Sequence, residues 1–228
     1  MYTQQLTADQ IRNVQVTFIN KVYSWMCLAL TVTGFIALRT VSSPDFLSMV
    51  QSNFIILIIV ELGIVFWMVS AINKISSNLA IGLFMFYSAL NGLTLSVILN
   101  LYTGASVAST FFITAGTFGV MSAYGFFTKK DLTSWGNLLF MGLIGIIIAS
   151  VVNIFMNSSA LYWLITYAGV LIFVGLTAYD TQKIKKMSLE MDIESEEGRK
   201  GAIMGALALY LDFINLFIFL LRIFGQRK

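Results

Sequence analysis

Residues 203–224 read IMGALALYLDFINLFIFLLRIF, an apolar run with Asp212 and Asn215 in its middle. About 20 apolar residues cross a hydrocarbon core roughly 30 Å thick as a helix, so this run has the length of a membrane span. A charged aspartate at the bilayer centre costs at least ~2.5 to 3.5 kcal/mol. We therefore expect Asp212 to face other helices rather than lipid.

The composition of the whole chain is typical of a membrane protein. Of its 228 residues, 58% are hydrophobic and only 11% charged, which is too few charges to cover a water-soluble globule. Polar breaks separate apolar runs at about 22–38, 54–72, 79–101, 105–127, 136–156, 161–181 and 203–224. The sequence predicts an all-α protein in the lipid bilayer, with a polar tail over residues 1–21 and one seven-helix transmembrane domain over 22–228.

The basic residues predict the orientation, because loops rich in Lys and Arg stay in the cytoplasm. Four lie on the side opposite the N-terminus: Arg39, Arg222, Arg227 and Lys228. The other ten lie on the N-terminal side: Arg12, Lys21, Lys74, Lys129, Lys130, Lys183, Lys185, Lys186, Arg199 and Lys200. We expect a multi-pass protein of the cell (inner) membrane with its N-terminus in the cytoplasm and its C-terminus outside. A six-span alternative, with a re-entrant last segment, would bring the C-terminus inside.

Several function classes are disfavoured by what the sequence lacks. It contains no histidine and a single cysteine, Cys27, which removes Ser-His and Cys-His catalysis and His-ligated metal sites. It has no glycine loop for binding phosphates, so active pumping is not expected. Its basic residues stand at the ends of apolar runs rather than in a block, so we expect no nucleic-acid partner. We expect neither an enzyme nor a cofactor.

Three acidic residues lie within or at the ends of apolar runs: Glu61, Asp180 and Asp212. In the last run, one helical face carries Gly201, Gly205, Ala208, Asp212 and Asn215. In the sixth run, which we expect to continue as a helix to Met187, the matching face carries Gly169, Phe173, Leu176 and Asp180. If these two faces meet, Asp180 and Asp212 lie within reach of each other.

Each of the three acids also has a local explanation. Asp180 can pair with Lys183, one turn further along its helix. Asp212 can be a buried protonated acid that is hydrogen-bonded to a carbonyl, to Tyr210 or to Asn215. Glu61 can make a single structural hydrogen bond. These readings stay open at the level of sequence.

A meeting of the two aspartates would have a specific chemistry. Two carboxylates that share a site do not both ionise cheaply, so such a pair holds one proton and senses pH without histidine. Loss of that proton leaves two negative charges, which repel the helices or recruit a cation. Calcium suits such a site, because it prefers oxygen ligands and tolerates irregular geometry. Asp180 and Asp212 are therefore the candidate ligands of a proton or a calcium ion.

Two stretches, AYDTQKI at residues 178–184 and LYLDFINLFIFLLRIFG at 209–225, resemble the Bax inhibitor-1 family, also called the transmembrane Bax inhibitor motif proteins, in its bacterial form. The resemblance spans nearly the whole chain. It implies six helices arranged around a central C-terminal helix, and a pH-sensitive calcium leak with Asp180 and Asp212 as the sensor.

The resemblance also suggests roles for further polar residues. Glu61 resembles the acidic residue that the family carries in its second helix, and Glu61 and Asn215 are candidates for the pore or gate. Some bacterial members have an arginine latch at the end of that helix. This chain reads WMVSAINK over residues 67–74, so Lys74 is the candidate latch.

Three alternatives remain at the level of sequence. Two carboxylates that trade a proton for calcium would also serve a calcium/proton exchanger. A regulator of a membrane-bound protease or of cell stress would act through protein contacts of its N-terminal tail. An intramembrane aspartyl protease would use Tyr179 and Asp180, but LYLD stands at 209–212 in place of Gly-x-Gly-Asp, and no proline follows.

Overall fold

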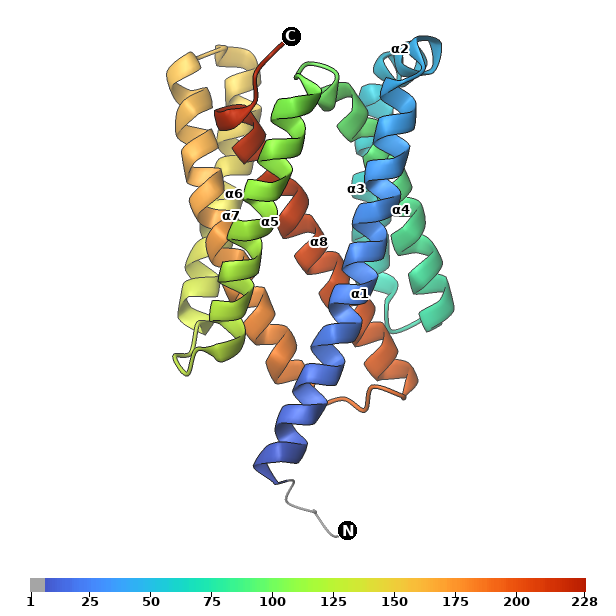
Figure 1. The fold of residues 1–228 in the computed structure, drawn as a ribbon, viewed down its shortest axis with the longest axis vertical. Coiled ribbons are helices and arrows are strands. Elements are labelled where there is room, and N and C mark those ends of the chain that lie inside the picture. Colours follow the sequence, from blue (N-terminus) through green and yellow to red (C-terminus); the bar gives the residue numbers. More distant parts are fainter. Residues whose placement is uncertain (1–6) are drawn as a thin grey trace. The chain divides into compact units, whose positions relative to one another are not determined.

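The computed structural model describes residues 7–228, and its regular elements there are all helices (Figure 1). They are α1 (Ala8–Val41), α2 (Pro44–Ser52), α3 (Phe54–Ala71), α4 (Ser77–Leu99), α5 (Gly104–Phe127), α6 (Thr133–Met156), α7 (Ser159–Met187) and α8 (Glu196–Phe224). Every helix except α2 is long and apolar enough to span a membrane. The predicted all-α fold with seven spans is confirmed.

The last span is one unbroken helix. α8 runs through 29 residues from Glu196 to Phe224, and at about 1.5 Å per residue it exceeds the thickness of the hydrocarbon core. This continuity supports seven spans over a re-entrant last segment. Two thirds of its apolar window, 67%, is buried, against 39% or less in the other spans.

Two helix ends differ from the predicted boundaries. α1 begins at Ala8 rather than near residue 22, because Thr7 and Gln10 form a reciprocal capping box that starts the helix early. Residues 1–6 of the predicted polar tail lie outside the described residues. α8 begins at Glu196 rather than near residue 203, and the acidic residues of its first turn suit the positive end of the helix dipole.

The short helix α2 is absent from the sequence prediction, which treated its residues as part of a connection. Pro44 is the first residue of α2, where its missing N–H costs nothing and its fixed φ favours a helix. Leu47 and Val50 then bury one face of the helix. The helix is too short to span, so the number of spans is unaffected.

The chain forms two compact units, which are described separately. The first comprises the described part of residues 1–100 together with 184–207. In this unit α1 packs along α4, where the hydroxyl of Thr33 donates to the carbonyl of Ser88 at 2.8 Å. A Cβ atom on Gly92 would lie 2.7 Å from the carbonyl oxygen of Thr33, so glycine permits the close approach of the two helices.

The second unit comprises residues 101–183 and 208–228 and contains both candidate aspartates. Its core joins α6, α7 and α8 through buried aliphatic and aromatic side chains: Ile146, Ile165, Ile172, Phe173, Leu176, Leu216, Phe219 and Leu220. The rings of Phe173 and Phe219 are stacked with centroids 5.9 Å apart. This packing holds the predicted face of α7 against α8.

Candidate functional site

Asp212 lies in the middle of α8 and is almost fully buried, with 4% of its surface exposed. Its neighbours along the helix, Tyr210, Phe213 and Leu216, are also buried. Asp212 is therefore enclosed by protein, as predicted, whereas Ala208 and Asn215 of the same predicted face are half-buried. Burial of an ionisable group at this depth requires a partner or a proton.

The partner of Asp212 in the structure is Asp180 on α7, and the two carboxyl groups lie within hydrogen-bonding reach of each other. A hydrogen bond between two carboxyls needs one of them to carry a proton, because an ionised carboxylate only accepts. Lys183, one turn beyond Asp180, also interacts with it electrostatically. Asp180 therefore interacts with both the carboxyl group of Asp212 and the charged side chain of Lys183.

Close packing between α5 and α7 positions Asp180. A Cβ atom on Gly125 would collide with the carbonyl of Ala178, two residues before Asp180. One residue after Asp180, the hydroxyls of Thr181 and Ser122 are hydrogen-bonded at 2.8 Å, and both residues are buried. This turn of α7 is therefore held against α5 by a backbone contact before Asp180 and by a buried hydrogen bond after it.

The next turn of α7 is attached to the connection between α5 and α6. The side chain of Gln182 donates to the carbonyl of Lys130 at 2.8 Å and accepts from the N–H of Leu132 at 2.9 Å. Gln182 is buried, so these two bonds satisfy an amide that would otherwise be costly. Thr181 and Gln182 lie within the AYDTQKI motif, and Ser122 meets Thr181 from α5, but none of the three was predicted from the sequence as a site residue.

One oxygen of the pair receives no N–H or hydroxyl donor. Oδ2 of Asp212 is buried and has no such donor within the part of the chain that the structure describes. A buried carboxyl oxygen without a partner carries the full cost of desolvation unless a proton or a cation meets it. Its need for a proton agrees with a proton shared between Asp212 and Asp180.

The pair alone offers few ligands to a metal. Over residues 7–228, no three His, Cys, Asp or Glu side chains gather at one point. Calcium takes six to eight oxygen ligands, so two carboxylates would need water or carbonyl oxygens to complete the shell. Such a site fits transient binding of a cation rather than tight storage.

Glu61 lies in a separate polar cluster between α3 and α4. It is 8% exposed, accepts from the hydroxyl of Thr94 at 2.9 Å and accepts from the amide of Asn91 at 3.4 Å. Tyr87 is hydrogen-bonded to Asn91 and interacts electrostatically with Glu61. Oδ1 of Asn91 is buried without a hydrogen-bond partner among the described residues. Glu61 therefore belongs to a buried network rather than making one isolated bond.

The partners of Glu61 were missed at the level of sequence, although a signal was present. Tyr87, Asn91 and Thr94 are spaced by four and three residues, which places them on one helical face of an otherwise apolar run.

The remaining two candidates are less enclosed. Asn215 donates to the carbonyl of Leu211 in its own helix at 2.8 Å, and Lys74 is exposed in the turn between α3 and α4.

Comparison with known proteins identifies the class of this seven-helix protein. The model of the family described as "Inhibitor of apoptosis-promoting Bax1" matches residues 15–228. The Inner membrane protein YbhL of Escherichia coli is 52% identical over 216 residues, covering 93% of this chain and 92% of the relative. A protein of Borreliella burgdorferi is 48% identical over 229 residues, covering 99% and 97%. An uncharacterized membrane protein of Streptococcus pyogenes is 43% identical over 171 residues, covering 74% and 72%.

The chain belongs to the Bax inhibitor-1 family. The family expectation drawn from AYDTQKI and the last span is confirmed. The name of the Escherichia coli relative and the apolar helices also support a multi-pass protein of the membrane.

Proposed function

We propose that this protein is a pH-sensitive calcium leak channel, gated by the Asp180–Asp212 pair, which binds either a proton or calcium. The observation that carries the proposal is the approach of two carboxyl groups, within hydrogen-bonding reach of each other, on membrane-spanning helices. With the shared proton in place, the pair holds α7 and α8 together and carries one negative charge fewer. The closed arrangement is the one that this bond stabilises.

Loss of the proton changes the balance at the pair. Two ionised carboxylates in a low-dielectric site repel each other, so the helices separate or a cation enters. Oδ2 of Asp212, which has no N–H or hydroxyl donor among the described residues, would be one of the oxygens that meet that cation. Calcium would bind weakly there, for want of a third carboxylate, and weak binding lets an ion leave as well as enter. Such a leak runs down the gradient and needs neither an enzymatic step nor a cofactor.

The other polar residues have secondary places in this proposal. Glu61 and its network offer a second buried acid along a membrane span, where an ion can be held in passing. Asn215 stands one turn beyond Asp212 on α8 and is a candidate gate residue. Lys74 is an exposed basic residue after α3 and is the candidate latch.

The test is calcium entry into proteoliposomes that hold the full chain, measured with an enclosed fluorescent indicator across a pH series. We expect native flux to change with pH, and Asp180→Asn and Asp212→Asn each to remove that change. Asp45→Asn is the matched control, because Asp45 is exposed on α2, away from the spans. Flux that is absent, or that keeps its pH response in both dyad variants, would overturn the proposal.

A calcium/proton exchanger is the nearest rival, because the same pair would serve it. The two are separated by enclosing a pH dye together with the calcium indicator and imposing a calcium gradient alone. With the membrane potential clamped and no proton ionophore present, a leak admits calcium without changing the internal pH. An exchanger exports protons as calcium enters, so the internal pH rises.

A further inference from the structure

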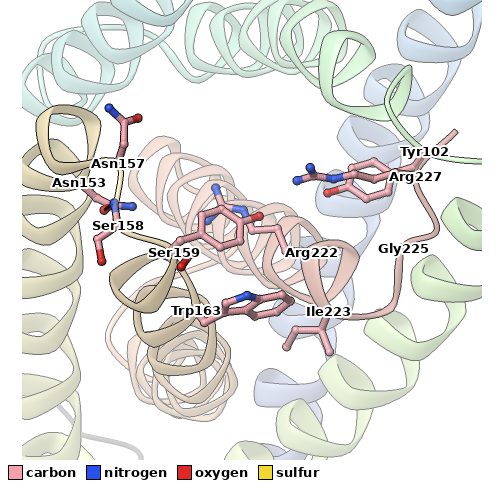
Figure 2. A pocket seen from close by; sticks show the side chains of 11 residues that line it. Tyr102, Asn153, Asn157, Ser158, Ser159, Trp163, Arg222, Ile223, Gly225 and Arg227 are labelled. Carbon is pink, nitrogen blue, oxygen red and sulfur yellow. Dashed lines mark hydrogen bonds between the residues drawn. The ribbon is translucent and has the colours of Figure 1, made fainter.

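A cleft of about 610 Å³ lies at the end of the second unit that is formed by the start of α7 and the end of α8 (Figure 2). Its lining includes Arg222 on α8, Arg227 in the C-terminal tail, and Trp163 on α7. The remaining lining residues are polar or aromatic apart from Ile223 and Gly225: Tyr102, Asn153, Asn157, Ser158, Ser159 and Tyr162. The volume lies in the range of small-ligand sites.

The charge of this cleft is one-sided. It holds two arginines and no acidic residue. The acidic residues of the whole second unit are Asp131, Asp180 and Asp212, none of which lines the cleft. The first turn of α7 adds the positive end of a 29-residue helix. The cleft therefore favours an anion.

Both arginines are held in place by the fold. The guanidinium of Arg222 lies over the ring of Tyr162, 5.2 Å from its centroid, and 5.1 Å from that of Phe219. These contacts orient the guanidinium through its flat face and leave its N–H groups at the edge to donate elsewhere. An arginine oriented in this way loses little freedom on binding an anion.

Arg227 is held through the backbone of the tail. The N–H of Thr103 donates to the carbonyl of Gln226 at 2.9 Å, and the N–H of Lys228 donates to the carbonyl of Leu101 at 3.0 Å. Arg227 and Tyr102 form an antiparallel bridge between these two bonds. Figure 2 shows Arg227 and Tyr102 on one side of the cleft, with Asn157 and Ser158 across from them.

The tail reaches this position because residue 225 is glycine. A Cβ atom on Gly225 would lie 2.5 Å from the ring of Tyr102 and would collide with the carbonyl of Leu221. The predicted orientation places Arg222 and Arg227 outside the cell membrane, on the side where basic residues are usually few. A built pair of arginines with no acidic partner beside it calls for a ligand of the opposite charge.

We propose that this cleft binds the phosphate group of an anionic ligand. The two guanidinium groups match phosphate oxygens in geometry and charge, and the amides and hydroxyls opposite them suit a hydroxylated headgroup. Because α6, α7 and α8 are membrane spans, their ends at the cleft are expected at the level of the lipid phosphates. Leu164 and Tyr167, which follow the cleft residue Trp163 on α7, are exposed and offer a surface for acyl chains. An anionic phospholipid is the source that this location favours.

The test uses the full chain, stripped of lipid in neutral detergent, with binding followed by native mass spectrometry and thermal unfolding. The probes are phosphatidylglycerol, phosphatidylethanolamine and inorganic phosphate. We expect phosphatidylglycerol to be retained and to raise the melting temperature more than phosphatidylethanolamine. The double variant Arg222→Gln, Arg227→Gln should weaken phosphatidylglycerol binding about tenfold or more, since each lost bond joins charged groups.

Control variants separate a built site from general attraction between charges. Arg39→Gln removes an exposed arginine at the end of α1, outside the cleft, and should leave binding unchanged. Because Arg222 packs on two rings, its loss can harm folding, so Arg227→Gln and Arg227→Lys are measured alone. Gln should weaken binding, and Lys, which keeps the charge but not the planar fork of donors, should restore part of it.

Each outcome decides the question. Loss of binding in Arg227→Gln with none in Arg39→Gln supports the proposal. A response to inorganic phosphate equal to that of phosphatidylglycerol keeps the phosphate site but assigns it to a free anion. The proposal is overturned if the Arg227→Gln variant retains phosphatidylglycerol and phosphatidylethanolamine as well as the native chain does. It is also overturned if Arg39→Gln weakens phosphatidylglycerol binding as much as Arg227→Gln does.

Discussion

The carbonyl of Ala178 on α7 fills the space that a Cβ atom on Gly125 of α5 would need. The two helices therefore touch backbone to backbone, two residues before Asp180. Small residues at such contacts are how membrane helices approach closely, since no hydrophobic force acts between helices in lipid. The position of one aspartate thus depends on the absence of a side chain on another helix.

We predict that Gly125→Ala destabilises the protein by roughly 1 to 3 kcal/mol, because the added methyl group forces α5 away from α7. Thermal unfolding of the purified chain measures this loss. Gly119→Ala is the matched control on the same helix, because a Cβ atom there meets nothing within 4 Å. Gly119→Ala should be neutral or slightly stabilising. Equal stability of the two variants would show that this contact does not hold α5 and α7 together.

The two aspartates should behave as one unit. If Asp180 and Asp212 share a proton, either Asn substitution already removes the titrating pair, so the double variant adds nothing further to the loss of pH response. Calcium flux at several pH values, measured for both single variants and the double variant, gives the coupling. Independent, additive effects of the two substitutions would contradict a shared proton.

Two variants of the Glu61 network separate the effect of its charge from the effect of its hydrogen bond. Glu61→Gln keeps an acceptor for Thr94 but removes the acid, so we expect a folded protein with reduced calcium flux and an intact pH response. Thr94→Val keeps the acid but removes its 2.9 Å hydrogen bond, which should cost about 0.6 to 2 kcal/mol of stability. Flux and thermal unfolding are measured on both variants. Native flux in Glu61→Gln would exclude Glu61 from the ion path.

The contact of Asp180 with Asp212 could be predicted because it depends on periodicity. A carboxylate in an apolar helix must face protein, and the small or polar residues at three- and four-residue spacing mark that face. The network around Glu61 was harder to foresee, because Asn91 and Thr94 are neutral residues that a span tolerates without a partner. Their role follows only from the packing of α3 against α4.

Other features depend on contacts that no local pattern reveals. The cleft residues Arg222 and Arg227 could be read only as topology signals, because the strand-like pairing of residues 226–228 with 101–103 joins distant parts of the chain. The early start of α1 was missed because a capping box, rather than hydrophobicity, sets it. Gly125 gave no signal, because the need for glycine comes from the carbonyl of another helix.

A contact between Glu196 and Ser77 attaches the start of α8 to the start of α4. Glu196 accepts from the N–H of Ser77 at 2.5 Å and from its hydroxyl at 2.9 Å, so it caps α4 from outside that helix. We predict that Glu196→Ala lowers the melting temperature, because the buried N–H of Ser77 loses its acceptor. Glu197→Ala, at the next and also exposed position, is the control. The same melting temperature for both variants would argue against this cap.

The orientation of the spans can be tested with single cysteines on a Cys27→Ser background. Gln51 is exposed on α2, after the first span, and Lys129 is exposed between α5 and α6. Since basic residues favour the cytoplasm, we predict that Gln51→Cys reacts with an impermeant maleimide in intact cells, whereas Lys129→Cys reacts only after the membrane is opened. Lys228→Cys distinguishes seven spans from six, because an unbroken α8 places the C-terminus on the same side as Gln51. Labelling of Lys129→Cys alone in intact cells would reverse the orientation, and with it the side of the membrane to which the two arginines of the cleft belong.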